Sequence, residues 1–313
     1  MPCYIHVFDE SPVELWGLSS SQRIRRELER ELSSLRRKGT AAVPARSIVI
    51  VEDLQQLPPA ADVMLFRGDY LYDVRVITNL FAAADTLLQV SEDGAGVTVA
   101  AHTGAAAALR VMDHIRGNDQ QLPVTLNIET PASLVPRTHI RLKKVQAPFV
   151  LPISNTNSRT LERHLFKTAY KGITDLVTKW VWPAPARQVT RLCVRLGIQP
   201  NHVTTVSWVL AILTGLLFYQ GEFITGLISG WLMTFRDTGD GKLARVTVTS
   251  RPLGNYLDHI LDLLHPPFWY LAWGLGLVSF EPAFLSVAMS TMITLIFIGY
   301  IAGRVVEGIV SWM

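Results

Sequence analysis

The sequence predicts a protein in two parts, an α/β domain on a mostly parallel sheet followed by an all-α helical transmembrane domain. Three observations lead to this prediction. Short β-rich runs alternate with helical stretches over residues 1–150, and long apolar stretches dominate from residue 201 onward. Only 18% of the residues are charged, whereas soluble domains carry about 25%. The presence of only two cysteines excludes a disulfide framework, and a net charge of +3 does not favour nucleic acid as a partner.

The order of elements in residues 1–150 is typical of an α/β domain. Ser20–Arg37 is the clearest helix, because Ile24, Leu28 and Leu32 recur at helical spacing in a charged segment. Two more helices are expected at Ala105–Ile115 and at residues 74–84. The expected strands are residues 4–8, 47–51, 63–66, 86–90, 97–101 and 124–127. This alternation favours a mostly parallel sheet with helices on both faces. The chain starts without a signal-peptide pattern, so we expect this domain in the cytoplasm.

Residues 151–200 are predicted to join the two domains as a linker with interfacial helices. Pro152 and the run Ser-Asn-Thr-Asn-Ser at 154–158 mark the linker. Beyond it, cations such as Lys167 alternate with apolar residues such as Leu165 and Trp180. This mixture is typical of amphipathic helices at a membrane surface, where lysine and arginine meet anionic headgroups. The alternative is a charged helix face in water.

The domain at 201–313 contains four candidate spans, at residues 203–220, 223–235, 253–280 and 282–303. Lysines and arginines gather up to Arg195, between Arg236 and Arg251, and at Arg304, whereas the two other connections lack cations. The positive-inside rule places the cation-rich segments on the cytoplasmic side. We therefore expect an integral protein of the cytoplasmic membrane with its N-terminal domain in the cytoplasm.

Four acidic residues stand in a fixed pattern around the connection between the second and third spans. The pattern DxxDGxxAR-x8-GxxxDxxxD begins at Asp237 and ends at Asp262. On helices, Asp237 and Asp240 share one face, and Asp258 and Asp262 share another. Carboxylates that converge repel each other unless cations neutralise them, and oxygen ligands favour Mg²⁺ or Mn²⁺. The alternative is that these carboxylates pair with neighbouring arginines and lysines at the helix ends.

This pattern is present without a substitution and resembles the signature of the CDP-alcohol phosphatidyltransferase family. Pro200-Asn201-xx-Thr204, ahead of the first span, also resembles the family's juxtamembrane motif. The resemblance covers about residues 160–313. It implies a membrane enzyme of phospholipid biosynthesis that moves a phosphatidyl or phosphoalcohol group from a CDP-alcohol, such as CDP-diacylglycerol, to an alcohol acceptor and releases CMP. The site would face the cytoplasm.

The resemblance also implies roles for individual residues. The metal, Mg²⁺ or Mn²⁺, would be held by Asp237, Asp240, Asp258 and Asp262, and Asp262 would also act as general base. The cytidine diphosphate pocket would be lined by Asn201, Thr204, Gly241, Ala244 and Arg245. Arg245 is suited to clamp a phosphate, although a cation at a membrane surface has the same appearance. An inositol phosphate acceptor would meet Lys167, Lys171, Arg191 and Arg195, whose positions the positive-inside rule explains equally well.

The N-terminal half resembles, more weakly, the nucleotidyltransferase-like domain of fused inositol-phosphate transferases. Residues 66–72, Phe-Arg-Gly-Asp-Tyr-Leu-Tyr, are similar to that fold's Gly-Asp segment, in which the aspartate (here Asp69) can hold a metal. Such a domain needs a glycine-rich loop after its first strand to cradle a triphosphate. Here Asp9, Glu10 and Pro12 follow the first strand instead. We therefore expect Asp69 to be a turn or cap residue, in a degenerate domain without cytidylyltransferase activity.

Several alternatives remain open at this point. The family has six spans in its membrane domain and four are present here, so we expect either a shortened protein or a fragment. A shortened domain favours a non-catalytic membrane scaffold, and an active N-terminal domain would make the chain bifunctional. An ion-coupled transporter is less favoured, because its carboxylates would lie near the membrane midplane within inverted repeats. For the enzyme we expect a homodimer whose partners are a CDP-alcohol, an alcohol acceptor and membrane lipids.

Overall fold

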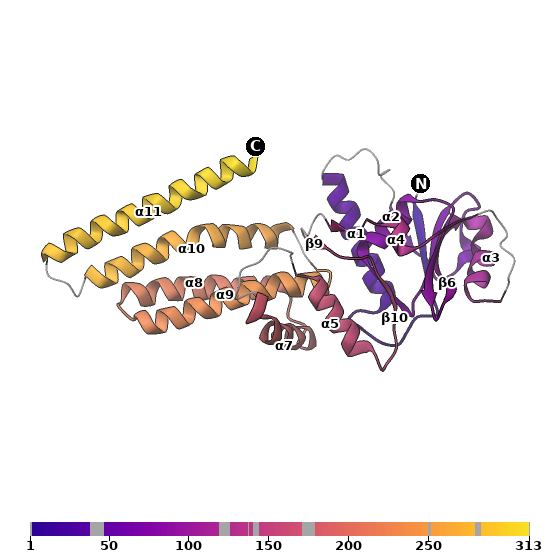
Figure 1. Ribbon diagram of the computed structural model, residues 1–313, viewed down its shortest axis with the longest axis horizontal. Coiled ribbons are helices and arrows are strands. Elements are labelled where there is room, and N and C mark those ends of the chain that lie inside the picture. Colours follow the sequence, from indigo (N-terminus) through magenta and orange to yellow (C-terminus); the bar gives the residue numbers. More distant parts are fainter. Residues whose placement is uncertain are drawn as a thin grey trace. The chain divides into compact units, whose positions relative to one another are not determined.

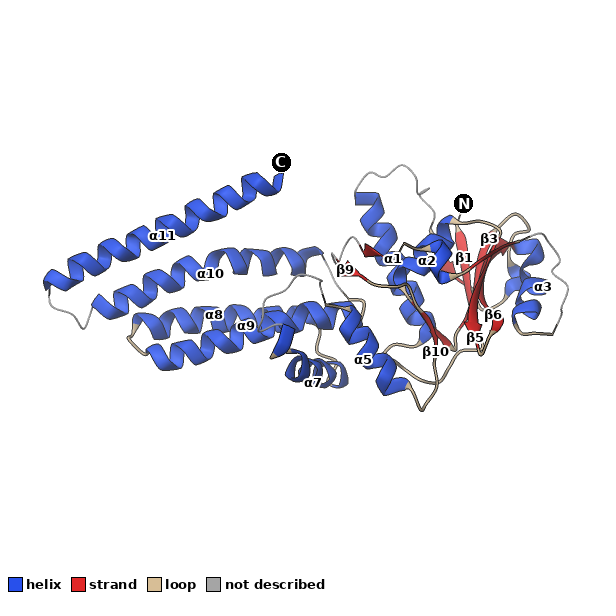
Figure 2. Cartoon of the chain, viewed as in Figure 1, coloured by secondary structure: helices blue, strands red, loops and turns tan. Residues whose placement is uncertain are grey.

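A computed structural model of the chain describes residues 2–37, 47–118, 126–136, 138–139, 144–170, 179–249, 252–278 and 283–312 (Figure 1). The chain forms two compact units. The first comprises Met1–Thr174 and Val246–Val248, and the second comprises Asp175–Arg245 and Thr249–Met313. In the described residues the strands belong to the first unit, and long helices make up the second (Figure 2). This confirms the predicted order of an α/β domain followed by a helical domain.

The first unit is built on a mixed sheet. Its strands are β1 (Cys3–Phe8), β2 (Ile48–Ile50), β3 (Asp62–Arg67), β5 (Thr86–Glu92), β6 (Ala95–Gly104) and β7 (Asn127–Glu129), in the order β2-β1-β3-β6-β5-β7. The pairs β1–β2, β1–β3 and β5–β7 are parallel. By contrast, β6 runs antiparallel to β3 and to β5. Among the described strands of this sheet, β6 alone is reversed and the other five run in one direction, so the predicted mostly parallel sheet is confirmed with one antiparallel strand.

A tight turn at Asp93-Gly94 explains the direction of β6. Both residues have positive φ angles, 49° and 83°, which is the backbone that a two-residue type I′ hairpin turn requires. A connection this short can only join antiparallel strands, because parallel neighbours need a crossover of a dozen or more residues. The Asp-Gly pair between two β-rich runs is the sequence signal for this hairpin.

Helices cover both faces of the sheet, as predicted. They are α1 (Ser20–Arg37) and α2 (Val74–Ala82) on one face, and α3 (Ala105–Ile115) on the other. Because successive side chains of a strand point to opposite faces, β3 contributes to two separate cores. Met64 and Phe66 lie in a buried cluster with residues of α1 and α2. Val63 and Leu65 lie in a second cluster with residues of α3.

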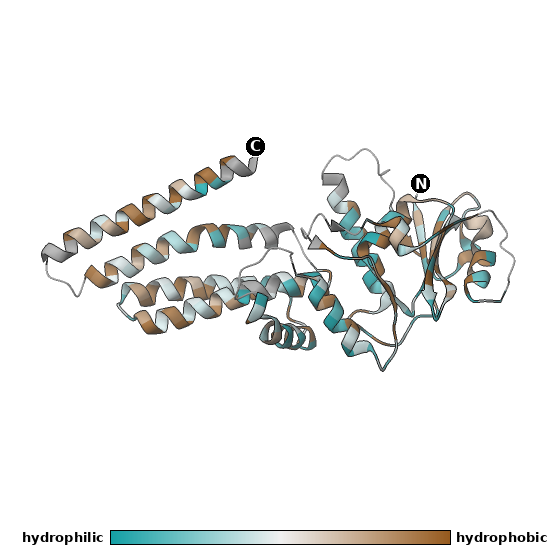
Figure 3. Cartoon of the chain, viewed as in Figure 1, coloured by the Kyte–Doolittle hydropathy of each residue, from teal (hydrophilic) through white to brown (hydrophobic). Residues whose placement is uncertain are grey.

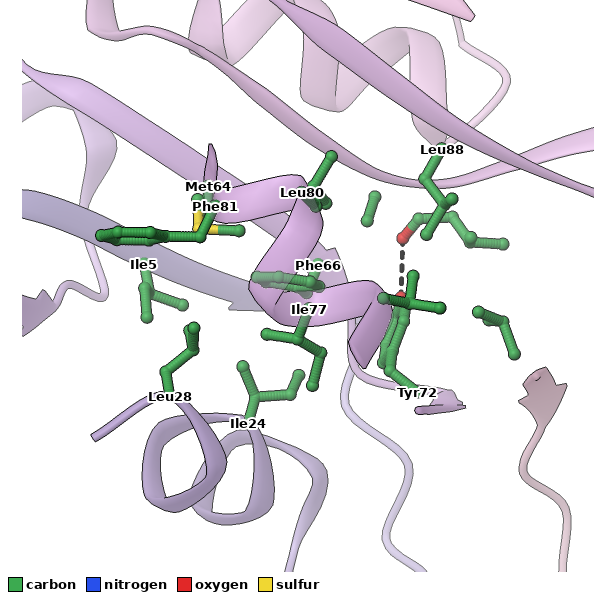
Figure 4. Packing of buried hydrophobic residues seen from close by; sticks show 14 of the residues in the cluster. Ile5, Ile24, Leu28, Met64, Phe66, Tyr72, Ile77, Leu80, Phe81 and Leu88 are labelled. Atoms are coloured by element: carbon green, nitrogen blue, oxygen red, sulfur yellow. Dashed lines mark hydrogen bonds between the residues drawn. The ribbon is translucent and has the colours of Figure 1, made fainter. Parts of the chain in front are cut away.

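The first of these clusters is drawn in Figure 4. Ile24 and Leu28 of α1 lie one turn apart and approach Ile77 of α2. This is the apolar stripe from which the helix was predicted. The Tyr72 hydroxyl donates to the backbone oxygen of Val99 at 2.7 Å, so the polar end of this buried ring has a partner inside the core.

The other elements of the first unit are η1 (Leu54–Gln56), β4 (Tyr70–Tyr72), α4 (Pro131–Leu134), β8 (Thr138–His139), β9 (Lys144–Val145), β10 (Val150–Pro152) and α5 (Ser158–Thr168). β10 pairs with β4 in an antiparallel ladder. Trp16 binds α5 twice, since its backbone N–H donates to the Glu162 carboxylate (3.3 Å) and its indole N–H donates to the Glu162 backbone oxygen (3.0 Å). The start of the segment predicted as a linker therefore packs onto the α/β domain.

The second unit contains α7 (Pro183–Arg195), α8 (Pro200–Tyr219), α9 (Phe223–Val246), α10 (Pro252–Val278) and α11 (Ala283–Trp312). Within the described residues, α8 and the segment Val287–Glu307 of α11 are long and apolar enough to cross a membrane, and brown apolar residues predominate along both in Figure 3. α9 and α10 have 24 and 27 residues, which suffices by length, but they contain the charged motif. Two of the four predicted spans are thus supported, and the other two stay predictions.

The surface of the helices and the contacts between them both suit a lipid environment. Ile212, Trp231 and Leu295 are each more than half exposed, and large exposed apolar surfaces on a protein mark membrane or partner contacts. Between helices, the Thr214 hydroxyl of α8 donates to the Ser229 hydroxyl of α9 at 2.9 Å. Such pairing of small polar residues joins helices in lipid, where water is absent.

Candidate functional site

The acidic motif lies on two consecutive helices of the second unit. α9 carries Asp237 and Asp240 near its end, and α10 carries Asp258 and Asp262 in its first half. The structure describes the backbone at all four positions and the side chain of Asp262, which is half-buried. The helical placement of both halves of the motif is therefore confirmed. The convergence of the four carboxylates stays a prediction, because three of these side chains lie outside the described part.

The helices that carry the motif meet about one turn from the aspartates. Met233 of α9, Leu261 of α10 and Ala211 of α8 form a buried cluster. Position 237 follows Met233 by four residues and position 258 precedes Leu261 by three, so each shares a helix face with its cluster residue. At a rise of about 1.5 Å per residue, both positions lie about 4–6 Å along their helices from the cluster. The backbone thus places positions 237 and 258 at a similar depth.

The beginning of α8 lies beside the beginning of α10. A Cβ added to Gly254 would come within 3.2 Å of the side-chain oxygen of Asn201, so glycine permits this approach. From α9, the Arg236 guanidinium donates to the backbone oxygen of Val203 at 2.9 Å. Thr204 is 6% exposed, and its hydroxyl donates to the Pro200 backbone oxygen at 3.3 Å. Asn201 and Thr204, both predicted for the nucleotide pocket, therefore lie where the three motif-bearing helix ends gather.

Arg245 folds back over Gly241, one turn earlier on α9. A Cβ at position 241 would lie 3.2 Å from the Nη2 atom of Arg245 and 3.7 Å from its Cζ atom. A larger residue at 241 would compete with the guanidinium for this space. The structure thus brings together two residues predicted for the nucleotide pocket, with the half-buried Ala244 beside them. Lys242, on the same turn, is only 3% exposed.

Asp262 lies near a residue of α11 that the sequence did not single out. The Tyr300 hydroxyl donates long hydrogen bonds of 3.5 and 3.4 Å to the backbone oxygens of Asp262 and Leu263. The contact joins α11 to the part of α10 that carries the motif. Local patterns gave no signal for it, because 38 residues separate Tyr300 from Asp262.

In the first unit, the carboxylate of Glu10, in the loop after β1, binds the start of α1. Glu10 accepts a hydrogen bond of 2.8 Å from the backbone N–H of Ser21 in the first turn of α1. Burial alone would raise the pKa of Glu10, but hydrogen bonds from Ser21 and Ser19 outweigh it, and the pKa lies below its usual value. A helix N-terminus attracts anions, and here the chain supplies that anion itself.

Asp69 stands in the turn between β3 and β4 and is paired with an arginine. The Arg67 guanidinium donates to both carboxylate oxygens of Asp69, at 3.0 and 2.6 Å. Next to it, a Cβ on Gly68 would lie 2.6 Å from the Cα atom of Glu10, so the glycine permits close contact between the turn and the loop after β1. This geometry agrees with the expectation that Asp69 is a turn residue.

The donor set of the motif fits a hard divalent cation. Four carboxylates without thiol or imidazole ligands are the chemistry that Mg²⁺ and Mn²⁺ prefer. Among the side chains that the structure describes, no three His, Cys, Asp or Glu residues gather closely enough to hold a metal. That set includes Asp262 but not Asp237, Asp240 or Asp258, so the metal site stays a prediction from the motif.

These features define a class of protein, in which an α/β domain is joined to an apolar helical domain with a paired acidic motif. Residues 198–311 match the sequence model for CDP-alcohol phosphatidyltransferase. The helical domain is therefore similar to the CDP-alcohol phosphatidyltransferase family over the residues that carry the motif, which confirms the resemblance seen in the sequence. The family is membrane-embedded, in agreement with the two apolar helices.

Two curated proteins are similar to the chain. Over 113 residues it is 31% identical to the archaetidylinositol phosphate synthase of Pyrococcus horikoshii, which covers 35% of this chain and 59% of that protein. Over 157 residues it is 29% identical to the bifunctional IPC transferase and DIPP synthase of Thermococcus kodakarensis, which covers 44% of this chain and 36% of that protein. The chain thus spans less than two thirds of the length of either relative.

Proposed function

We propose that this protein is a phospholipid-biosynthetic transferase. It moves a phosphatidyl or phosphoalcohol group from a CDP-alcohol, such as CDP-diacylglycerol, to an alcohol acceptor and releases CMP. The observation that carries the proposal is the unbroken DxxDGxxAR-x8-GxxxDxxxD pattern, whose two halves lie on α9 and α10 next to the contact between Met233 and Leu261. The family match over residues 198–311 supports the same activity.

The residues of the site divide into those that hold the donor and those that act on the acceptor. Asp237, Asp240, Asp258 and Asp262 would hold Mg²⁺ or Mn²⁺, which when bound supplies positive charge to the pyrophosphate of the donor. Arg245 would pair with a phosphate oxygen as a charge-assisted hydrogen-bond donor. Gly241 and Ala244 are small and leave space around Arg245. Asn201 and Thr204 would border the nucleotide from α8.

Asp262 acts as the general base in this proposal. The hydroxyl oxygen of the acceptor forms a bond to the phosphorus that carries the lipid alcohol. The bond from that phosphorus to the bridging pyrophosphate oxygen breaks, and CMP leaves with the electron pair. The hydroxyl proton passes to the Asp262 carboxylate, a transfer typically worth 10²–10⁴ in rate.

An inositol phosphate is the acceptor that we favour. The name of the relative from Pyrococcus horikoshii contains an inositol phosphate, and the chain offers cations for an acceptor phosphate. Arg191 and Arg195 lie one turn apart on α7, while Lys167 is an exposed residue of α5. Lys171, the fourth predicted contact, lies outside the described residues.

The proposal includes a membrane topology and an assembly. The protein spans the cytoplasmic membrane with four helices, the motif faces the cytoplasm, and two copies form a homodimer surrounded by lipid. The exposed apolar faces of α8 and α11 support the membrane placement. The cation distribution of the sequence supports the orientation.

A direct assay of CMP release tests the proposed function. Purified protein in lipid vesicles is incubated with Mn²⁺, with CDP-diacylglycerol or an archaetidyl CDP-alcohol, and with a panel of polyols and polyol phosphates. We expect CMP to appear together with a new phospholipid, most of it with an inositol phosphate. Folded protein that releases no CMP with any pair of substrates would favour the scaffold alternative.

A further inference from the structure

Two successive prolines, Pro266 and Pro267, lie inside α10 just beyond the motif. A proline has no backbone N–H, so it cannot donate to the carbonyl four residues earlier in a helix. The acceptors that lose this helical donor are the backbone oxygens of Asp262, the proposed base, and of Leu263. In a helix within lipid such carbonyls take donors from neighbouring side chains, since water is absent. The regular hydrogen bonding of α10 is therefore interrupted at the last residue of the motif.

The Tyr300 hydroxyl of α11 lies at both of these carbonyls. It is 3.5 Å from the backbone oxygen of Asp262 and 3.4 Å from that of Leu263. A single hydroxyl hydrogen shared between two acceptors forms a three-centre bond, which agrees with the length of both distances. Next to them, the Nδ1 atom of His265 lies 2.8 Å from the Leu261 backbone oxygen. Tyr300 is thus placed at the two acceptors that the prolines release from the helix.

The packing of α11 against α10 holds this tyrosine in place. A Cβ on Gly274 would overlap the side chain of Ile293, which is 9% exposed, so the two helices are in close contact there. Tyr300 follows Ile293 by seven residues, or two turns, and shares its helix face. The Tyr300 ring also packs edge-on against the Tyr270 ring, with the ring centroids 6.3 Å apart. The hydroxyl is therefore delivered to α10 by a packed helix and not by a loop.

We propose that Tyr300 is a positioning residue for Asp262. The inference rests on the proposed function, in which the Asp262 carboxylate accepts the proton of the acceptor hydroxyl. By binding the backbone of the turn that carries Asp262, Tyr300 sets the place from which this carboxylate reaches the substrate. A base must lie within hydrogen-bond reach of its proton, and a displacement of about 1 Å can cost 10²-fold in rate. Loss of the Tyr300 hydroxyl should therefore slow the chemical step more than it weakens donor binding.

The variant Tyr300→Phe tests this role because it removes the hydroxyl and keeps the ring. In assays of CMP release, we expect kcat to fall about tenfold while KM for the CDP-alcohol stays within about twofold of the wild-type value. The matched control is Tyr270→Phe, which removes the hydroxyl of the neighbouring ring on α10 (46% exposed). It should keep the wild-type kcat. An unchanged kcat in Tyr300→Phe, or equal losses in the two variants, would overturn the proposal.

Replacing both prolines tests whether Tyr300 acts through the two carbonyls. Pro266→Ala together with Pro267→Ala returns two backbone N–H groups to α10, so the carbonyls of Asp262 and Leu263 regain their helical donors. In this background Tyr300→Phe should change kcat by less than about twofold, whatever the two alanines do by themselves. The same loss of about tenfold in both backgrounds would overturn the proposal, because Tyr300 would then act by another route.

Hydrogen exchange separates a failure of this inference from a failure of the proposed function. Amide exchange of peptides from residues 256–272 is measured in vesicles without substrate, for the wild type, Tyr300→Phe and both proteins with the alanine pair. Tyr300→Phe should speed exchange about tenfold in the parent chain and leave it unchanged beside the alanines. Equal exchange in the wild type and Tyr300→Phe would overturn the contact itself. The expected exchange without CMP release from any of these proteins would establish the contact and overturn the proposed transfer.

Discussion

Two carboxyl groups, one in each unit, show how single residues take their properties from their surroundings. Asp262 is half-buried on α10 and directly follows Leu261, one of the residues that line an apolar groove between α8 and α10. Glu27 of α1 is buried (7% exposed), and its carboxylate lies 3.9 Å from the guanidinium of Arg23. The position of Asp262 suits a group that exchanges a proton with a substrate. Glu27 instead is a buried structural carboxyl group with a raised pKa.

Substitutions at two aspartates separate the base from the metal ligands. Asp262→Asn keeps the shape and one oxygen ligand but removes the proton acceptor. It should lower the rate of CMP formation by about 10²–10⁴ while CDP binding is largely retained. Asp237→Asn should instead weaken the metal-dependent binding of CDP itself. Steady-state kinetics and calorimetric titration with CDP measure both effects.

The control for this pair is Glu307→Gln, which removes a carboxylate at an exposed position paired with Arg304. It should keep the wild-type rate. Normal turnover by Asp262→Asn would assign the base to another group.

Burial raises the pKa of Glu27 to about 7, against the opposing effect of Arg23 and Arg30 and with support from Asp73 and Glu31. Since the unfolded pKa is about 4.5, the folded state binds more protons between these values. Stability should therefore fall as pH rises from about 4.5 to 7, by an amount on the order of 3 kcal/mol.

Glu27→Gln should remove this dependence on pH. The measurement is amide hydrogen exchange of α1 peptides over this pH range, corrected for the intrinsic exchange rate. Identical slopes for the variant and the wild type would mean that another group titrates.

At the scale of elements, the turn between β3 and β4 depends on close contact with the loop after β1. Gly68→Ala would place a Cβ 2.6 Å from the Cα atom of Glu10, and backbone atoms cannot move aside as a flexible side chain can. We expect a loss of about 1–3 kcal/mol in the free energy of unfolding. Gly104→Ala, at a position with open space, is the matched control. The free energies of unfolding of both variants are measured with denaturant. Equal midpoints would show that the turn can move away from Glu10 without a loss of stability.

We expect the proposed activity to depend on a divalent cation held by the motif of α9 and α10. Four carboxylates that converge from two helices would repel each other without a metal. EDTA should therefore abolish CMP release, Mg²⁺ or Mn²⁺ should restore it, and Zn²⁺ alone should not. Full turnover in chelator would show that the aspartates have another role.

At the scale of the whole molecule, we expect the α/β domain to accompany the membrane domain without the activity of a nucleotidyltransferase. A CTP triphosphate needs free backbone N–H groups at a helix N-terminus, whereas Glu10 already binds the first turn of α1. The full chain with CTP, Mg²⁺ and inositol 1-phosphate should release no pyrophosphate above background. Pyrophosphate release that disappears when Asp69 is replaced would establish a bifunctional enzyme. Otherwise we expect the domain to serve as a cytoplasmic docking or dimerisation module, or as a lid.

Much of the secondary structure and the motif could be predicted from the sequence, because both depend on local patterns. The bounds of α1 and α3 agree with those expected from apolar periodicity, and α2 ends two residues before its expected end. The alternation of strands and helices indicated an α/β domain with both faces of the sheet covered. The spacing from Asp237 to Asp262 indicated the family whose model residues 198–311 match, and it placed the aspartates on two helices.

Only the tertiary structure decided which distant residues meet. The antiparallel direction of β6, the contact of Trp16 with Glu162 and the cluster of Met233, Leu261 and Ala211 all join segments that no local pattern connects. The apolar groove lined by residues of α8 and α10 likewise forms only when these two helices pack. Periodicity records which face of a helix is apolar, but the partner of that face is selected by shape and by the free energy of packing the whole chain.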